Sequence, residues 1–296
     1  MKRIAVCSVL AIAAVVAPPL ADAQMAREMK DITYALAEGA PLALDLYLPA
    51  GVSKPPLLVW VHGGAWSAGT KSNYPKELVE RGFAVASLDF RQTTQAPFPA
   101  NVQDIKAAIR FLRAKARDYG YAADKIAIAG ASSGGHLAAL VGVTNGNATL
   151  EGKEGNYVDQ SSSVQAIISY FGASDLNTIL AQSTPVGLKV REPALERLLG
   201  ALPAQAKELA TLASPVTHVD RTDPPLLLLH GDQDPQMPIN QSHELQGAYQ
   251  KAGLDVDFDV VHGAAHGGQV FFTGEQLDRA VAFLNRTIGT GARPRS

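Results

Sequence analysis

The stretch KIAIAGASSGGHLAAL, residues 125–140, decides the fold. Its apolar start predicts a strand over Lys125–Ala129, and the Ala/Leu-rich run after the glycines predicts a helix that continues to Val143. Between them, residues 130–134 match the pattern G-x-S-x-G. A serine on a tight turn between a strand and a helix stands above the carboxyl edge of a sheet, and the flanking glycines let the two elements approach each other. The stretch therefore predicts an α/β fold with a reactive serine at a sheet edge.

Two serines are adjacent in this turn, so the choice of nucleophile depends on the glycines. Centring the pattern on Ser132 places Gly130 and Gly134 two residues away on either side. Centring it on Ser133 would place Ala131 at the first of these positions, where its methyl group crowds the turn. Ser132 is therefore the candidate nucleophile. The backbone N–H of Ser133, at the start of the helix, is free to bind an oxyanion.

Apolar runs alternate with helical patterns on both sides of this stretch. Further strands are predicted over Ile32–Leu36, Leu42–Leu48, Pro56–Val61, Phe83–Asp89, Val164–Phe171, Leu226–Leu229 and Val256–Val261, the first two antiparallel around a turn at Glu38 and Gly39. Helices are predicted over Tyr74–Arg81, Asn101–Tyr119, Ser242–Lys251 and Leu277–Arg286. This alternation predicts a mostly parallel sheet that is covered by helices on both faces.

Two segments interrupt the alternation. Gly146–Ser163 is polar and contains glycines, which is typical of a surface loop. The span from about Asn177 to Val219 has helical pieces between two core strands. We expect it to form a short cap over one end of the sheet, where it would wall a substrate pocket.

Composition excludes several classes of protein. The chain has 296 residues, of which 47% are hydrophobic and 18% are charged, so it is not intrinsically disordered. The formal net charge of -2 gives no reason to expect a nucleic-acid partner. A single cysteine rules out an intrachain disulfide and a Cys-based zinc site. We expect neither a metal nor a cofactor.

The first residues are typical of a secretory signal rather than of the folded domain. Lys2 and Arg3 precede the apolar run Ile4–Val16, and Ala21-Asp22-Ala23 forms a small-x-small cleavage site. Residues 1–23 are therefore expected to be a signal peptide, and residues 24–296 a single secreted or periplasmic domain. A short membrane anchor is the alternative, which the brevity of the apolar run disfavours.

A serine nucleophile needs a histidine base, and the base needs a carboxylate that orients it. His266 lies in the small-residue loop GAAHGG, residues 263–268, after the last predicted strand, and His262 is its close rival. For the acid we favour Asp234 in HGDQDPQMP, residues 230–238, because it follows a core strand. Asp232 lies nearer the end of the same strand, which is typical of a turn residue, and Asp175 follows the strand Val164–Phe171; these two are the alternatives.

The oxyanion hole needs further N–H donors. The motif HGGAW at residues 62–66 follows an early core strand, and it points to the backbone N–H groups of Gly64 and Ala65. Trp66 is either the floor of the substrate pocket or a packing residue. Together with Phe98, it is a candidate determinant of substrate choice.

With these motifs the chain resembles the α/β-hydrolase superfamily. Within it, the chain is similar to the esterase/lipase branch that includes hormone-sensitive-lipase-like enzymes and bacterial feruloyl or acetyl-xylan esterase-like (BD-FAE-type) proteins. The resemblance runs from about Asp45 to Phe283 and rests on HGGAW at 62–66, APFP at 96–99 with Asp104, GASSGGHLAAL at 130–140, SPV at 214–216 and HGDQDPQMP at 230–238. It implies an eight-stranded sheet, a triad of Ser132, Asp234 and His266, no metal, and a structural role for Asp104.

The chain departs from the family pattern at three places, one of which is Met237 where a valine is usual, a conservative apolar change. Ala65 stands where the third glycine of HGGG is usual, a change that backbone donors tolerate. Gly267 and Gly268 follow His266 where an aromatic residue often sits, which opens the pocket. Together with the expected signal peptide, the resemblance implies a secreted or periplasmic carboxylic ester hydrolase for small short-chain or aryl esters, feruloyl and acetyl esters among them. The alternatives are an amidase or peptidase on the same scaffold and a non-catalytic binding protein.

Overall fold

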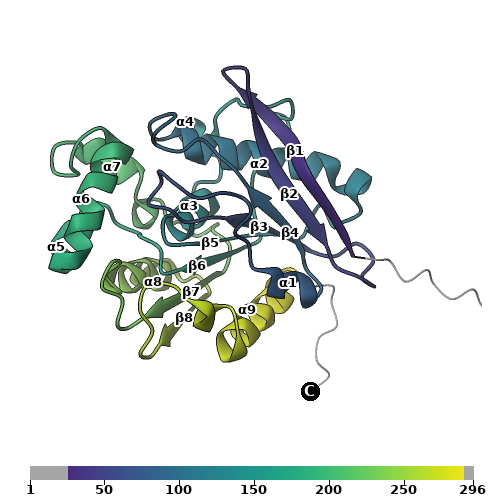
Figure 1. The fold of residues 1–296 in the computed structure, drawn as a ribbon. Coiled ribbons are helices and arrows are strands. Elements are labelled where there is room, and N and C mark those ends of the chain that lie inside the picture. Colours follow the sequence, from purple (N-terminus) through teal and green to yellow (C-terminus); the bar gives the residue numbers. More distant parts are fainter. Residues whose placement is uncertain (1–25, 290–296) are drawn as a thin grey trace, which may run out of the picture.

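A computed structural model describes residues 26–289 of the chain, which form one eight-stranded sheet with the order β1-β2-β4-β3-β5-β6-β7-β8 (Figure 1). β1 pairs antiparallel with β2, β2 pairs antiparallel with β4, and the remaining pairs are parallel. The strands are β1 (Arg27–Ala37), β2 (Ala40–Leu48), β3 (Leu57–Val61), β4 (Ala84–Leu88), β5 (Ile126–Ala131), β6 (Ala166–Tyr170), β7 (Leu226–Gly231) and β8 (Val256–Val261). The mostly parallel eight-stranded sheet expected from the sequence is confirmed.

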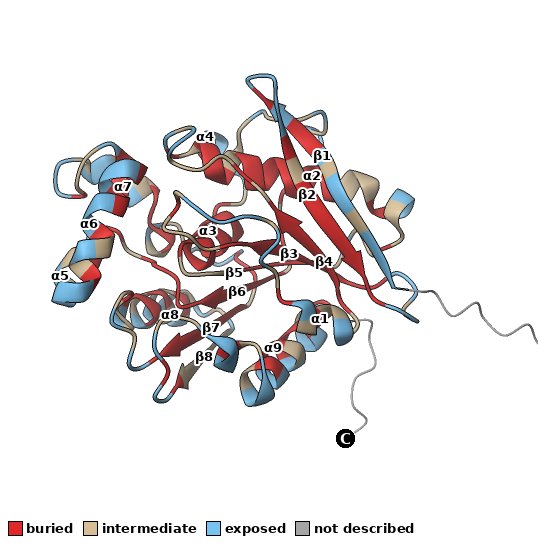
Figure 2. Ribbon diagram, viewed as in Figure 1, coloured by how far each residue is buried: buried red, intermediate tan, exposed pale blue. Residues whose placement is uncertain are grey.

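Side chains of the central strands alternate between two hydrophobic cores, one on each face of the sheet. In β3, Leu57 and Val59 join one core, whereas Leu58 and Trp60 join the other. The first core is covered by α2 (Ala100–Tyr119), α3 (Ser133–Gly142) and α8 (Asn240–Ala252), and the second by α1 (Lys76–Glu80) and α9 (Gly274–Thr287). Figure 2 shows β3, β4, β6 and β7 buried along their whole length. Burial on both faces explains why their sequences are continuous apolar runs.

Helix α2 anchors the loop that follows β4. Its apolar residues Ile105, Ile109 and Leu112 recur at helical spacing and are buried. On the same helix, the fully buried carboxylate of Asp104 accepts hydrogen bonds from the guanidinium of Arg91, at 2.6 Å from Nη2 and 2.9 Å from Nε. It also accepts the backbone N–H of Arg91 at 2.9 Å. Asp104 thus fixes the loop after β4 to the helix.

The segment Gly146–Ser163 is more than the surface loop expected from its sequence. It contains the short helix α4 (Ala148–Glu151), whose Leu150 is buried. Glu151 forms ion pairs with two cations of α2, Arg110 and Lys106, which are both buried. Buried cations need a carboxylate partner, and this need draws the polar segment onto the fold.

The excursion between β6 and β7 consists of α5 (Ile179–Gln182), α6 (Pro185–Leu199), α7 (Lys207–Leu212) and the 3-10 turn η1 (Pro215–Thr217). Figure 1 shows α5, α6 and α7 together at one side of the sheet. A second 3-10 turn, η2 (Gln269–Phe271), precedes α9. Within residues 26–289, no helix is long and apolar enough to cross a membrane. The signal peptide expected over residues 1–23 lies outside the described residues.

Candidate active site

The turn between β5 and α3 holds Ser132 in a strained backbone conformation. Its φ is 57° and its ψ is -122°, in a region that non-glycine residues rarely occupy. The backbone N–H of Ser132 donates to the carbonyl of Tyr170 at 2.9 Å, which ties the turn to β6. A Cβ on Gly134 would lie 2.1 Å from the carbonyl oxygen of Val61, so only glycine allows α3 to start this close to the sheet.

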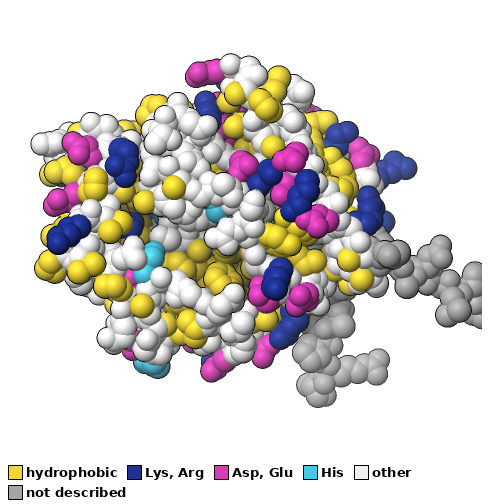
Figure 3. Space-filling model, viewed as in Figure 1, with side chains coloured by type: hydrophobic (Ala, Val, Ile, Leu, Met, Phe, Trp, Pro, Cys, Tyr) yellow, Lys and Arg dark blue, Asp and Glu magenta, His cyan; other side chains and the backbone are white. Residues whose placement is uncertain are grey.

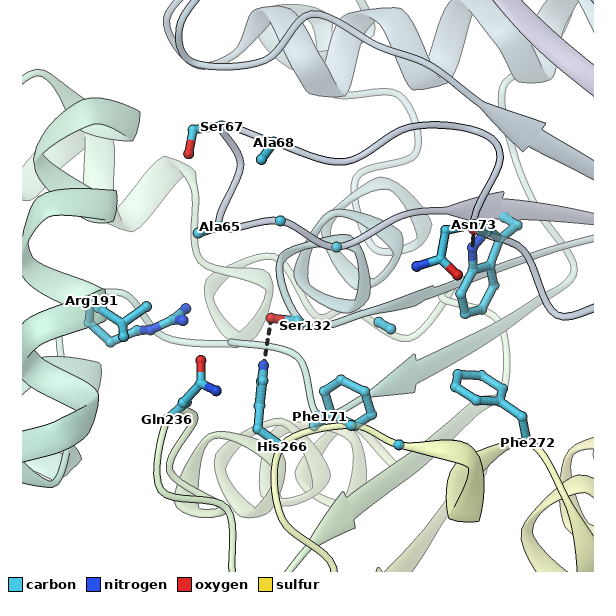
Figure 4. Close-up of a pocket in the computed structure, with 17 residues that line it drawn as sticks. Ala65, Ser67, Ala68, Asn73, Ser132, Phe171, Arg191, Gln236, His266 and Phe272 are labelled. Carbon is cyan, nitrogen blue, oxygen red and sulfur yellow. Dashed lines mark hydrogen bonds between the residues drawn. The ribbon is translucent and has the colours of Figure 1, made fainter.

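Three side chains from separate loops form one chain of hydrogen bonds. The hydroxyl of Ser132 lies 2.9 Å from Nε2 of His266, and Nδ1 of His266 lies 2.6 Å from Oδ2 of Asp234 (Figure 4). The carboxylate fixes the tautomer, because Nδ1–H donates to Asp234 and leaves Nε2 free to accept the serine proton. The structure therefore brings together the nucleophile, base and acid candidates favoured on sequence.

Asp234 is held as a carboxylate by its surroundings. Its side chain is buried, and its Oδ1 accepts the backbone N–H groups of Gln236 at 2.8 Å and Met237 at 2.9 Å. Burial alone would raise the pKa of Asp234, but hydrogen bonds from His230 and His266 and from the backbone hold that pKa well below its usual range. The acid therefore stays charged at neutral pH and can stabilise a protonated His266.

The rival residues form other contacts. His262 pairs with Asp232 at 2.8 Å, but the His262 side chain is 83% exposed and this pair lies apart from Ser132. Asp175 accepts the backbone N–H of Asn177 at 2.9 Å and forms a local turn. Neither carboxylate is bonded to His266, so the geometry separates Asp234 from both alternatives.

The loop after β3 brings backbone groups to the mouth of the serine site. Gly64 and Ala65 line the same cavity as Ser132. Gly64, Ala65 and Trp66 have φ values of 129°, 52° and 58°, and the carbonyl of Gly64 accepts the N–H groups of Ser67 and Ala68 at 3.0 Å. Ser133 is the first residue of α3, so its N–H has no partner inside the helix. These are the three positions at which the sequence predicts oxyanion donors.

Trp66 does not line the cavity, contrary to its candidate role as a pocket floor. It is 1% exposed and packs in the core, where its Nε1–H donates to Nδ1 of His136 at 3.0 Å. The other ring nitrogen of His136, Nε2, donates to the carbonyl of Ala213 at 2.7 Å. A buried indole N–H needs an acceptor, and the buried histidine supplies it.

Phe98 also lies away from the cavity. Its side chain is buried in the core on the α2 face of the sheet, and its backbone N–H donates to the carbonyl of Leu198 at 3.4 Å. It therefore packs beneath α6 instead of facing a ligand. The expectation that Phe98 lines the substrate pocket is wrong, because its side chain is buried in this core and other residues line the cavity above Ser132.

The cavity above Ser132 has a volume of about 690 Å³ and two unlike sides. Figure 4 shows Phe171, Phe272 and Asn73 on one side of Ser132, and Arg191 and Gln236 on the other. In the space-filling view, hydrophobic side chains gather near the middle of this face, and most charged side chains lie around its rim (Figure 3). The site thus combines an aromatic wall with a polar wall.

Sequence reasoning singled out none of these wall residues individually, although Arg191 lies in the excursion over 177–219 that was expected to wall the pocket. Phe171 directly follows β6, and the carboxyl ends of parallel strands meet at one sheet edge, so its position could have been found. Arg191 and Phe272 come from the excursion and from the segment after η2, where no motif marks them. Within residues 26–289, no group of three or more His, Cys, Asp or Glu side chains is placed to hold a metal ion.

The chain is similar to a known protein family and to curated esterases. The family model described as BD-FAE matches residues 44–249. The Mycobacterium tuberculosis esterase LipQ is 32% identical over 203 residues, which are 67% of this chain and 46% of LipQ. The curated relatives that match are longer, and the chain spans about half of their length.

Among the solved structures that share the fold across nearly the whole chain are two esterases. A truncated carbohydrate esterase from gut microbiota superposes with a TM-score of 0.78 at 31% identity, covering 90% of this chain and 98% of that protein. The butyrate-bound form of the Thermogutta terrifontis esterase Est2 superposes with a TM-score of 0.70 at 26% identity, covering 93% of this chain and 97% of that protein. The described domain therefore has the α/β-hydrolase fold that the sequence resemblance implied.

Proposed function

The chain belongs to the BD-FAE family of α/β-hydrolase esterases, and from this premise we propose that it is a serine carboxylic ester hydrolase acting on small short-chain or aryl esters. One observation carries the proposal. The hydrogen-bonded chain from Ser132 through His266 to Asp234 ends in a cavity that the backbone of Gly64 and Ala65 also lines. Nucleophile, base, acid and oxyanion donors thus converge on one point.

The geometry supports an acyl-enzyme mechanism. Ser132 Oγ attacks the ester carbonyl carbon while His266 Nε2 takes the hydroxyl proton, and Asp234 stabilises the resulting imidazolium. The negative oxygen of the tetrahedral intermediate is held by backbone N–H groups of Gly64, Ala65 and Ser133, each worth about 3 kcal/mol in the transition state. Collapse breaks the bond to the alcohol, which leaves with the proton from His266.

Deacylation repeats the same steps with water. His266 takes a proton from water, and the hydroxide attacks the carbonyl carbon of the acyl group on Ser132. The second tetrahedral intermediate collapses, the serine oxygen recovers its proton from His266, and the carboxylic acid leaves. No further group is needed to balance these two half-reactions.

The size and lining of the cavity support small esters with an aryl or sugar component. A volume of about 690 Å³ accommodates a small molecule, and Trp60, Phe171 and Phe272 offer aromatic surface to it. Two of the similar solved structures are a carbohydrate esterase and an esterase with bound butyrate. Acetyl, butyryl and feruloyl esters are therefore the first substrates to test.

A fluorophosphonate probe tests the proposed nucleophile directly. It forms a covalent bond only with an activated serine, so we expect one label per chain on the tryptic peptide that contains Ser132, with loss of 4-nitrophenyl acetate hydrolysis in parallel. An Asp234→Asn variant should label much more slowly. An unlabelled, inactive protein would favour the binding-protein alternative, and activity on amides alone would favour the amidase.

Export is part of the proposal and rests on the sequence of residues 1–23. Expression in a Gram-negative host, followed by N-terminal sequencing of the periplasmic protein, should give a chain that starts at Gln24. Recovery of the unprocessed chain in the membrane fraction would instead support the short anchor.

A further inference from the structure

Arg191 of helix α6 carries a charge that the described protein leaves without an anion. The residue is 1% exposed, and both Nε and Nη1 are buried without a hydrogen-bond partner. A guanidinium is always protonated and offers five N–H donors, so a buried one needs acceptors. Burying such a charge without a partner disfavours the fold, which makes Arg191 an exception that calls for a function.

The side chain faces the serine site. Arg191 lines the same cavity as Ser132 and His266, and Figure 4 shows it extending from α6 toward Ser132, with Gln236 beside it. Among the described residues that line this cavity, Arg191 is the only lysine or arginine, and none is aspartate or glutamate. The polar wall of the cavity therefore has an uncompensated positive charge.

The neighbours of Arg191 do not neutralise it. Its guanidinium carbon lies 5.8 Å from the ring centroid of Trp66, an interaction that leaves the N–H groups unbonded. The charge of Asp234 acts on Arg191 from a distance, but the Asp234 oxygens already accept bonds from His266 and from the backbone of Gln236 and Met237. No ion pair joins Arg191 to a carboxylate of residues 26–289.

The position of Arg191 is fixed relative to the acid loop. Thr184 caps the start of α6 by accepting the N–H of Gly187 at 3.0 Å, and its hydroxyl donates to the carbonyl of Pro235 at 2.6 Å. α6 is thereby tied to the loop that also carries Asp234 and Gln236. A cation held this way presents donors to a ligand without first having to be ordered.

We propose that Arg191 is a specificity-determining residue that binds a carboxylate on the ester substrate, so that the preferred substrates are carboxylate-bearing esters. The proposal rests on the proposed function, because the carboxylate would be bound while Ser132 attacks the ester at the other end of the same molecule. Planar guanidinium and carboxylate groups match each other in two parallel hydrogen bonds. The side chain of Gln236, beside Arg191, would add a neutral hydrogen bond.

The test compares pairs of esters that differ only in charge. For a carboxylate on the alcohol side the pair is 4-acetoxybenzoate and 4-acetoxybenzamide, and for the acyl side it is monoethyl adipate and ethyl adipamate. We expect the wild type to show a kcat/KM for the anionic member of one pair that is roughly tenfold or more above that for its amide. The pair that shows the preference identifies the side on which the carboxylate binds.

Variants then assign the preference to Arg191. Arg191→Met should bring the anionic-to-neutral ratio of kcat/KM to about one or below, and Arg191→Lys should restore it in part. Arg197→Met, at an exposed position of the same helix, is the matched control and should keep the wild-type ratio. If Arg191→Met fails to fold, the wild-type protein still tests the proposal. Its ratio of kcat/KM for the anionic ester to kcat/KM for the neutral ester should exceed one and should decrease at high salt.

These measurements distinguish failure of the proposal for Arg191 from failure of the proposed esterase function. If the wild type hydrolyses the neutral esters but prefers neither anionic member, the proposal for Arg191 is overturned while the esterase function stands. The same holds if Arg191→Met lowers both members of a pair equally, since Arg191 would then only support the fold. If no ester of either pair is hydrolysed, the proposed function itself fails.

Discussion

The indole N–H of Trp66 donates to Nδ1 of His136 across 3.0 Å, which connects the loop that carries Gly64 and Ala65 to the first turn of α3. The second nitrogen of His136 donates to the carbonyl of Ala213, in the excursion before β7. One buried imidazole thus bridges three segments: the loop after β3, the helix that follows Ser132, and the excursion. The donors of the proposed oxyanion hole lie on the loop after β3 and on α3. This bridge therefore fixes their positions relative to each other.

The bridge predicts a pH-dependent stability. Burial lowers the pKa of His136 from 6.5 to about 4, so between these values the unfolded chain binds a proton that the folded chain does not. The free energy of unfolding therefore falls as pH falls from 6.5 to 4, by about 3 kcal/mol from this residue at most. In urea titrations, the stability difference between wild type and His136→Gln should shrink by that amount between pH 7 and pH 4.

The exposed histidine of the second His–Asp pair supplies the control for that titration. His262→Gln should change stability little at either pH, because its side chain is 83% exposed. An equal pH dependence in wild type and His136→Gln would show that His136 is not held neutral by the fold.

Substitution of the two aspartates in the loop after β7 should have different effects on kcat. Asp234→Asn removes the acceptor that fixes the His266 tautomer, so kcat for 4-nitrophenyl acetate should fall by roughly 10³- to 10⁴-fold with little change in KM. Asp232→Asn weakens the exposed pair with His262 but keeps a side-chain oxygen that can accept the N–H of Gly263, so kcat should stay near the wild-type value. A large loss of kcat in Asp232→Asn and a small one in Asp234→Asn would instead assign Asp232 as the acid.

Removal of the buried ion pair between Asp104 and Arg91 should reduce the stability of the fold rather than the catalytic activity. Asp104→Ala leaves the guanidinium of Arg91 without its main partner, which should lower the free energy of unfolding by about 3 kcal/mol. Asp118→Ala breaks an exposed pair with Lys115 on the same helix and should change the denaturant midpoint little. Similar denaturant midpoints for the two variants would contradict the structural role given to Asp104.

Local patterns were sufficient to predict the sheet and the three side chains of the proposed triad. Buried strands have continuous apolar runs, and the glycines that flank Ser132 mark a turn that few other residues permit. Asp234 and His266 each follow a strand that ends at the same sheet edge as β5. Their convergence follows from the topology, and the topology follows from the alternation of strands and helices.

The walls of the cavity could not be predicted in the same way. Trp66 turns into the core because Ala65 and Trp66 both adopt positive φ and because the partner of its N–H comes from another element. Arg191 reaches the site only because α6 packs on the loop around Pro235. Such positions depend on contacts between segments that are far apart in the sequence. No local sequence motif indicates these contacts.

Hydrolysis of 4-nitrophenyl esters of increasing acyl length, C2 to C12, by wild type and Ser132→Ala tests the central claim most directly. Ser133→Ala, which removes only the neighbouring hydroxyl and keeps the backbone N–H, is measured beside them. We expect activity that is highest for short acyl chains, that persists in Ser133→Ala, and that falls to background in Ser132→Ala. A wild type inactive on every ester, or a Ser132→Ala variant that keeps the wild-type rate, would contradict the account of this site.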